Sequence, residues 1–120
     1  INNSFCASAI SPSGASKGKK EALEKRDNDS NKFNGMSIDE NISIVNNDIK
    51  DSLIGLSIED QILIDKKLIE LDGTLNKSKI GANTTIAVSM ATGLAMFGKR
   101  ALGVMQDLGI SFGEVLGSIR

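Results

Sequence analysis

The sequence has no histidine, tryptophan or tyrosine, and only one cysteine and one proline in 120 residues. Without histidine, the chain cannot itself supply a histidine-based triad, a histidine general base or a histidine metal ligand. With a single cysteine as well, a zinc site is not expected. Any metal ion bound here would be a hard cation held by oxygen atoms.

The lone Cys6 also excludes an internal disulfide. We therefore expect a reducing compartment, the cytoplasm, and a thiol that packs as a small buried hydrophobic group. No apolar run approaches the roughly 20 residues that span a bilayer. The opening residues, Ile1 to Ser4, lack the basic flank and apolar core of a signal peptide.

Charge of one sign is not in excess, because 14 basic residues face 15 acidic ones. This balance argues against non-specific nucleic-acid binding, which relies on clustered basic side chains. Hydrophobic residues make up 40% of the chain but aromatic residues only 3%. The composition predicts one domain with an aliphatic core.

The N-terminal quarter combines an apolar stretch with turn-forming residues. Alternation over Ser4–Ile10 predicts a short strand, and the Pro, Gly and Ser residues of Ser11–Gly18 predict a loop. Lys19–Arg26 is expected to form a short charged helix, with Glu21 and Lys25 spaced i, i+4. A polar loop should follow it.

Helical patterns dominate the remainder. Ser37 and Glu40 form a capping-box pattern, and Ile38, Ile42, Val45 and Ile49 then fall on one helical face. A second helix is expected after a cap at Ser57, with Ile64, Leu68 and Leu71 on its apolar face and Gly73 at its end. Both patterns are those of helices with one apolar face.

The last long pattern runs from about Ile80 to Leu108, with an apolar stripe at Leu94, Phe97, Ala101, Met105 and Leu108. Glycine costs about 1 kcal/mol relative to alanine inside a helix. A break near Gly98 or Gly103 is therefore expected. Ser111–Glu114 predicts the cap of a short terminal helix.

Two longer blocks are more specific than these periodicities. Pro12–Asp27 reads PSGASKGKKEALEKRD, and Leu71–Asn83 reads LDGTLNKSKIGAN. The first resembles the enolase pattern P-S-G-A-S-T-G-x-x-E-A-x-E-x-R-D, and the second resembles the enolase pattern L-D-G-T-x-N-K-S-x-x-G-A-N. The distance between them also fits that family, and Gly109–Gly117 (GISFGEVLG) is a looser third match.

The resemblance implies an α+β fold, in which the last strand of a small antiparallel meander precedes a helical bundle. Residues 1–120 would then be an incomplete enolase N-terminal domain, without its first strands and without the C-terminal barrel. Ile1 would lie in the interior of a family member.

The resemblance also implies an activity, the Mg²⁺-dependent dehydration of 2-phosphoglycerate to phosphoenolpyruvate in glycolysis. The general acid and base and the main metal carboxylates would lie in the barrel, so the chain alone should be inactive. A substrate-closing loop carries over, formed by Ser13, Gly14, Ala15, Ser16, Lys17 and Gly18. Ser16 would give oxygen to the second Mg²⁺. Lys17 stands where the family usually has Thr, and it could attract phosphate or repel the metal.

By the same resemblance a homodimer is expected. The charge balance and the lack of a long apolar run, in turn, predict neither a nucleic-acid partner nor a membrane span. The alternative function is a catalytically dead enolase remnant that acts as a protein-interaction or structural module. Without its partner strands and the barrel, the isolated chain should be partly molten or self-associate.

Overall fold

The structure is a computed structural model that describes residues 6–12 and 18–109. Within these residues the chain is mostly helical and contains no strand. The elements are a 3₁₀ turn η1 (Phe33–Gly35), α1 (Asp39–Ile44), a π-helical turn η2 (Val45–Ile49), α2 (Lys50–Leu53), α3 (Gln61–Asp72) and α4 (Ala82–Leu108).

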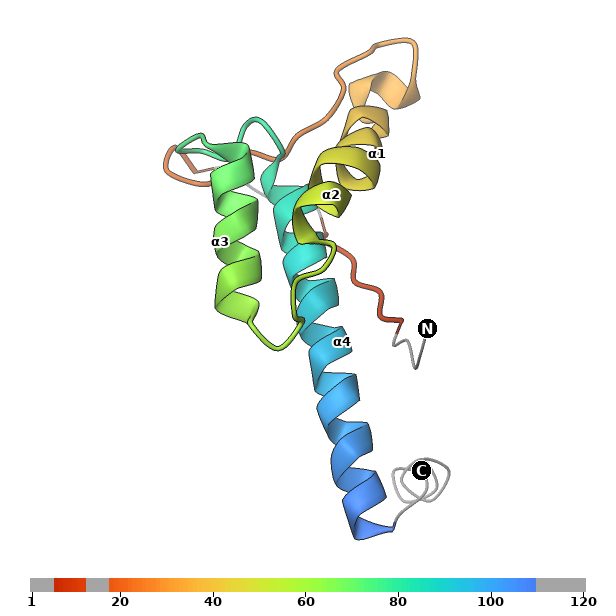
Figure 1. The fold of residues 1–120 in the computed structure, drawn as a ribbon. Coiled ribbons are helices and arrows are strands. Elements are labelled where there is room, and N and C mark those ends of the chain that lie inside the picture. Colours follow the sequence, from red (N-terminus) through yellow and green to blue (C-terminus); the bar gives the residue numbers. More distant parts are fainter. Residues whose placement is uncertain (1–5, 13–17, 110–120) are drawn as a thin grey trace.

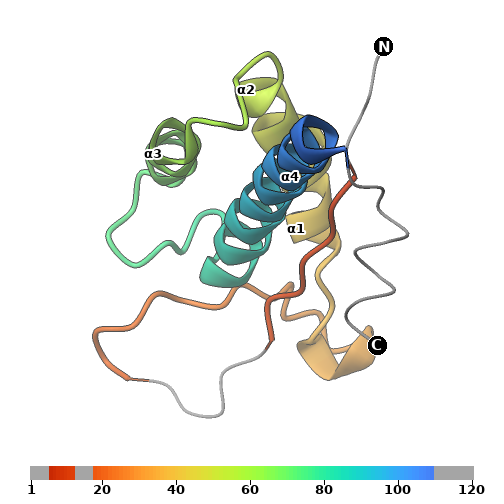
Figure 2. The same ribbon diagram turned by 90° about the horizontal axis from the view of Figure 1, so that it is seen from below.

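Helix α4 is the longest helix, and the other helices lie beside it. Its 27 residues span about 40 Å at 1.5 Å per residue. Figures 1 and 2 show α3 on one side of its N-terminal half and α1 on the other, while its C-terminal half extends away from both. The helix continues through Gly98 and Gly103, so the expected break is wrong.

The core lies where these helices meet. Its fully buried members are Ile49, Ile64, Leu68 and Ile80. Around them pack the partly buried side chains of Ile44, Val45, Leu53, Leu71 and Val88. The aliphatic core predicted from composition is confirmed, as is the apolar face of α3.

The α1 region keeps only part of its predicted apolar face. Ile49 is buried and Val45 packs on the core, but Ile38 and Ile42 are 38% and 49% exposed. The π-helical turn η2 accounts for the difference, because a turn wider than the α-helix changes which residues share a face.

Two predicted N-caps are wrong. Ser37 makes no cap for α1, whose first free amides are bound by the carboxylate of Asp27. For α3 the cap is Asp60, which accepts from the Leu63 amide at 3.0 Å, not Ser57. The predicted end of α3 is confirmed, since Gly73 adopts a left-handed conformation with φ of 68°.

The predicted helix at Lys19–Arg26 is also wrong, because residues 22–29 run without regular structure. Cys6 is exposed, contrary to expectation. Residues 6–10 have no strand partner, and the rest of Ser4–Ile10 and the terminal helix at Ser111–Glu114 lie outside the described residues. The α+β meander therefore stays a prediction. In the described part of the chain, no helix has the length and apolarity to cross a membrane.

Candidate functional site

The two sequence blocks meet in space. The Leu23 amide donates to the Asn76 carbonyl at 2.7 Å, and the Leu23 carbonyl accepts from the Ala82 amide at 2.7 Å. These bonds place residues just after the first loop against the turn that enters α4. They also explain why Lys19–Arg26 is not helical, because its backbone groups are bound to residues more than 50 positions away.

Asn83 continues this contact with its side chain. Its Oδ1 accepts from the Lys25 amide at 3.1 Å, and its Nδ2 donates to the Lys25 carbonyl at 3.0 Å. One amide side chain thus satisfies both backbone groups of Lys25. The first turn of α4 is thereby joined to the first sequence block.

Gly81 permits the close approach. Its φ is +97°, and a Cβ added there would lie 2.5 Å from the Lys25 Cβ and 2.6 Å from the Asn83 Oδ1. Both the backbone conformation and the space exclude any larger residue. The glycine of the second block is therefore required by the first block.

Asp72 holds the turn between α3 and α4. Its side chain is buried and accepts from the Ile80 amide at 2.7 Å, from the Thr74 amide at 2.9 Å and from the Thr74 hydroxyl. Burial by itself would raise the pKa of this carboxyl. The hydrogen bonds from Thr74 and Ile80, with the positive charge of Lys77, outweigh burial and lower the pKa of Asp72 below its usual value.

Asp27 has the same role for α1. Its carboxylate accepts from the Asp39 amide at 2.7 Å, the Glu40 amide at 3.1 Å and the Ser37 hydroxyl at 2.9 Å. Desolvation opposes its ionisation, but these bonds and the charge of Lys32 lower the pKa of Asp27. The last residue of the first block therefore caps a helix twelve residues further on.

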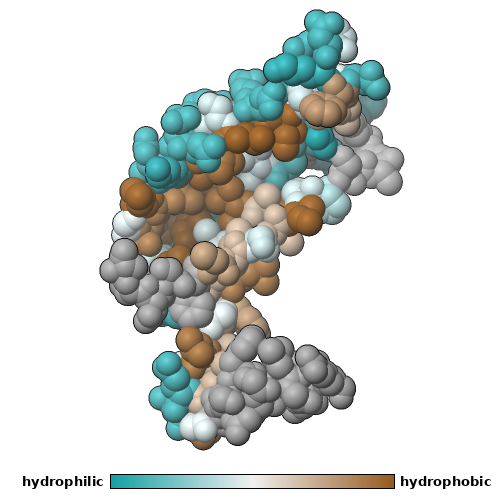
Figure 3. Space-filling view, turned by 90° about the vertical axis from the view of Figure 1, so that its right-hand side faces the viewer, coloured by the Kyte–Doolittle hydropathy of each residue, from teal (hydrophilic) through white to brown (hydrophobic). Residues whose placement is uncertain are grey.

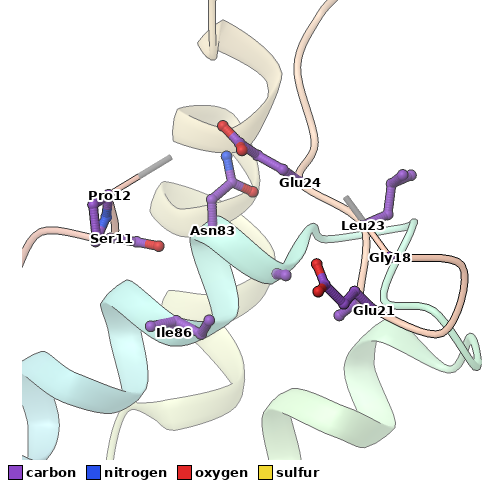
Figure 4. A pocket seen from close by; sticks show the side chains of 10 residues that line it. Ser11, Pro12, Gly18, Glu21, Leu23, Glu24, Asn83 and Ile86 are labelled. Carbon is purple, nitrogen blue, oxygen red and sulfur yellow. The ribbon is translucent and has the colours of Figure 1, made fainter. Parts of the chain in front are cut away.

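A cavity of about 240 Å³ opens beside these contacts. Pro12 and Gly18, the described residues on either side of 13–17, both line it, as do Glu21 and Glu24. Figure 4 shows Asn83 on α4 between Pro12 on one side and Glu21 on the other. The described residues that directly precede and follow positions 13–17 thus lie at one cavity.

Of the predicted loop residues, only Gly18 is described. It is exposed, and its carbonyl accepts from the Glu21 amide at 3.2 Å. Ser13, Gly14, Ala15, Ser16 and Lys17 lie outside the described residues. The roles assigned to Ser16 and Lys17 therefore stay predictions.

Oxygen atoms suit Mg²⁺, and the cavity lining offers them from Ser11, Glu21, Glu24 and Asn83. Glu24 is already paired with Arg26, whose Nε donates to it at 2.9 Å. Across residues 6–12 and 18–109, no three histidine, cysteine or acidic residues gather to hold a metal ion. The described residues therefore offer separate oxygen atoms at the cavity but no gathered set of metal ligands.

The sequence patterns identified both blocks but not the hydrogen bonds and close contacts that their individual residues make. Asp27, Gly81 and Asn83 all stand inside the blocks. Their spacing shows nothing of their partners, which lie up to 58 residues away. The order and distance of the two blocks indicated the family resemblance, but not which of their residues contact one another.

Comparison with known proteins supports the same grouping. The family model described as the enolase N-terminal domain matches residues 1–106. The enolase of Ehrlichia canis (strain Jake) is 44% identical over 109 residues, covering 91% of this chain and 26% of the relative. The enolase of Ehrlichia chaffeensis (strain Arkansas) is 47% identical over 91 residues, covering 76% and 22%.

The chain thus spans about a quarter of the length of these curated relatives. The match covers both sequence blocks and continues into α4. On this evidence the chain belongs to the enolase N-terminal domain family.

Proposed function

We propose that this chain is part of an enolase-like enzyme that dehydrates 2-phosphoglycerate to phosphoenolpyruvate in glycolysis. The observation that carries the proposal is the 44% identity to a protein named enolase over 109 residues. The chain covers only 26% of that relative, so the proposal places the acid–base groups and the main metal carboxylates in a following barrel. The enzyme would be cytoplasmic and homodimeric.

Within that enzyme, Ser13–Gly18 would be the mobile loop that closes over the substrate, and Ser16 would give an oxygen ligand to the second Mg²⁺. When bound, magnesium supplies positive charge that stabilises the negative charge of the transition state. A loop that closes after the substrate has bound can also exclude water from the reaction.

The anchoring of this loop supports its role. Pro12 and Gly18 line one cavity, and the backbone from Leu23 to Lys25 is bound to Asn76, Ala82 and Asn83. A loop hinged on fixed ends can move its centre without moving the domain. The structured residues of both blocks would therefore serve as the frame for Ser16.

A chimera tests this proposal. The matched 109 residues of the Ehrlichia canis enolase are replaced by those of this chain, and phosphoenolpyruvate formation is followed by its ultraviolet absorbance. We expect Mg²⁺-dependent turnover from the chimera and none from the 120-residue chain alone. A chimera that folds, by circular dichroism, but has no activity would favour the non-catalytic interaction module.

The Ser16→Ala variant of the chimera tests the metal ligand. Loss of one ligand should lower kcat by roughly a hundredfold and raise the Mg²⁺ concentration needed for half-maximal rate. Ser30→Ala, which removes an exposed hydroxyl outside the loop, is the matched control and should leave both values unchanged. Equal behaviour of the two variants would refute the role of Ser16.

Lys17→Thr, which restores the residue that the family usually has, distinguishes the two possible roles of Lys17. If the Lys17 ammonium attracts the substrate phosphate, the variant raises KM. If it repels the metal, the variant lowers the Mg²⁺ requirement instead.

A further inference from the structure

The turn that precedes α1 contains an asparagine followed by a glycine. Asn34–Gly35 is the one pair of this kind in the sequence. Asparagine is a thermally labile residue, because the backbone nitrogen of the next residue can attack its side-chain amide carbon. Glycine has no Cβ to shield that nitrogen. The pair therefore combines a reactive amide with the least hindered nitrogen that a following residue can offer.

The side chain of Asn34 is open to water. Asn34 is exposed, and within the described residues its side-chain amide takes part in no hydrogen bond. No residue of η1 is buried. Figure 1 shows η1 beyond the start of α1 and away from α3, and Figure 3 shows that this upper end of the molecule is mostly hydrophilic. Water therefore reaches the pair, and no packed side chains have to separate before it changes conformation.

The backbone of the pair is held by a single turn. Phe33 and Asn34 both have a positive φ, 49° and 53°. The Gly35 amide donates to the Lys32 carbonyl at 2.9 Å. These are the features of a type I′ turn. The attack requires that this hydrogen bond open and that ψ of Asn34 rotate away from 38°, and an exposed turn can open locally while the core stays folded.

We propose that Asn34 is a site of spontaneous deamidation, in which its side-chain amide becomes a carboxylate through a cyclic imide. The Gly35 nitrogen gives its proton to water or hydroxide and bonds to the Asn34 Cγ. The Cγ–Nδ2 bond then breaks, and the nitrogen leaves as ammonia. Water opens the imide at either carbonyl, which gives a normal aspartate or an isoaspartate. Each conversion consumes one water molecule and releases one ammonia, without a change in oxidation state.

Other residues of the chain have one of the two required features but not both. Asn46 and Asn47 are exposed, but they lie in η2 and are followed by residues with side chains. Asp72 precedes Gly73, but it is only 2% exposed and its carboxylate accepts from the Ile80 amide. An ionised carboxylate is also a poorer target for attack than an amide. Asn34 should therefore change first.

The isoaspartate product remodels the turn. Its main chain runs through the former side chain, so one additional carbon enters the backbone directly before Gly35. The Gly35 carbonyl accepts from the Asn28 amide at 3.1 Å, and next to it the Asp27 amide donates to the Ser37 carbonyl at 2.9 Å. Asp27 in turn caps α1. The modification thus acts on the support of the α1 cap and leaves the contact between α3 and α4 unchanged.

The inference concerns the chemistry of the chain itself and does not depend on the catalytic proposal. It is tested by mass spectrometry of the 120-residue chain after incubation in mildly alkaline buffer. Trypsin cleaves after Lys32 and Lys50 and releases residues 33–50 as one peptide, which holds four asparagines: Asn34, Asn41, Asn46 and Asn47. We expect Asn34 to deamidate at least about tenfold faster than each of the other three. Equal rates at the four positions would overturn the proposal.

Asn34→Gln should abolish the early release of ammonia, because its longer side chain would have to close a six-membered imide. Asn31→Gln is the matched control, since it makes the same change at an exposed asparagine of the same segment that is not followed by glycine. It should leave the release of ammonia unchanged. Similar loss in both variants, or in neither, would refute the assignment to Asn34.

Hydrogen exchange tests the consequence on the separated isoaspartate form. The Asn28 amide should exchange at least about tenfold faster than in the unmodified chain, while the Leu68 amide of α3 stays protected. Asn34→Asp is the matched control, because it carries the same charge on a normal main chain and should keep the Asn28 amide protected. Equal exchange in the isoaspartate form and in Asn34→Asp would contradict the remodelling of the turn.

Discussion

The residues at the two ends of α4 differ in what holds them. At the N-terminal end, Gly81, Ala82 and Asn83 contact residues 23–25 through a close backbone approach and three hydrogen bonds of 2.7 to 3.1 Å. At the C-terminal end, from Leu94 to Leu108, large apolar side chains face solvent. The first end is held by contacts with distant residues of the chain, whereas the second leaves large apolar side chains exposed in the described part of the chain.

This difference predicts that substitutions at the two ends of α4 will affect the stability of the fold to different degrees. The blocks that identify the family mostly fix one another, so their substitution should damage folding. The exposed half of α4 should tolerate substitution with little loss of stability. The four predictions below test that division, from the largest effect to the smallest.

Gly81→Ala should have the largest effect. The new Cβ would lie 2.5 Å from the Lys25 Cβ at a φ of +97°, and we expect a loss of about 3–5 kcal/mol in the free energy of unfolding. Gly55→Ala is the matched control, because its φ is also positive at +87° but nothing lies within 4 Å. It should cost only about 1–2 kcal/mol. Equal losses in urea unfolding would contradict the close contact.

Asp72→Asn should come next. The variant keeps the size of the side chain but weakens the hydrogen bonds that Asp72 accepts from Thr74 and Ile80, so we expect a loss of about 2 kcal/mol. The control is Asp48→Asn on the exposed side of η2, with a change of about 0.5 kcal/mol or less. A small effect at Asp72 would mean that its carboxylate does not organise the turn.

Acid should lower the stability of the fold through the carboxyl groups of Asp72 and Asp27. The pKa values of Asp72 and Asp27 are lowered in the folded state. Their charged forms thus stabilise the fold above the unfolded-state pKa of about 3.9, and this stability is lost as pH falls through the folded-state values. Asp72→Asn should flatten the fall of the urea midpoint between about pH 5 and about pH 2. An unchanged slope would count against the assignment.

Gly103→Ala should have the smallest effect, and of opposite sign. A Cβ at Gly103 meets nothing within 4 Å, and alanine favours a helix by about 0.5–1 kcal/mol over glycine. The thermal midpoint and helix content should therefore rise slightly. A decrease would show that α4 bends here, as the sequence pattern indicated.

Local signals were enough to predict the aliphatic core, α3 with Ile64 and Leu68 buried, and the left-handed Gly73. Each depends on residues within a few turns of one another. The resemblance to enolases also placed the two blocks in one family, and the comparison confirmed it.

The errors come from partners distant in sequence. Lys19–Arg26 has an acceptable helical pattern, but the backbone from Leu23 to Lys25 binds Asn76, Ala82 and Asn83 instead. Ser37 and Glu40 have capping-box spacing, yet the carboxylate of Asp27 accepts the hydrogen bonds from the first α1 amides. A pattern read within one segment cannot show that a distant residue will bind the same backbone groups. Ser16 remains a prediction from resemblance alone.

The account depends most directly on the joining of the two blocks, and amide hydrogen exchange measures it. In the intact chain the amides of Leu23, Lys25 and Ala82 should exchange slowly although the first two lie outside any helix. Asn83→Ala should release the Lys25 amide while leaving the amides in the middle of α3 protected. Leu23 and Lys25 amides that exchange as fast as those of Lys19 and Lys20 would contradict the account.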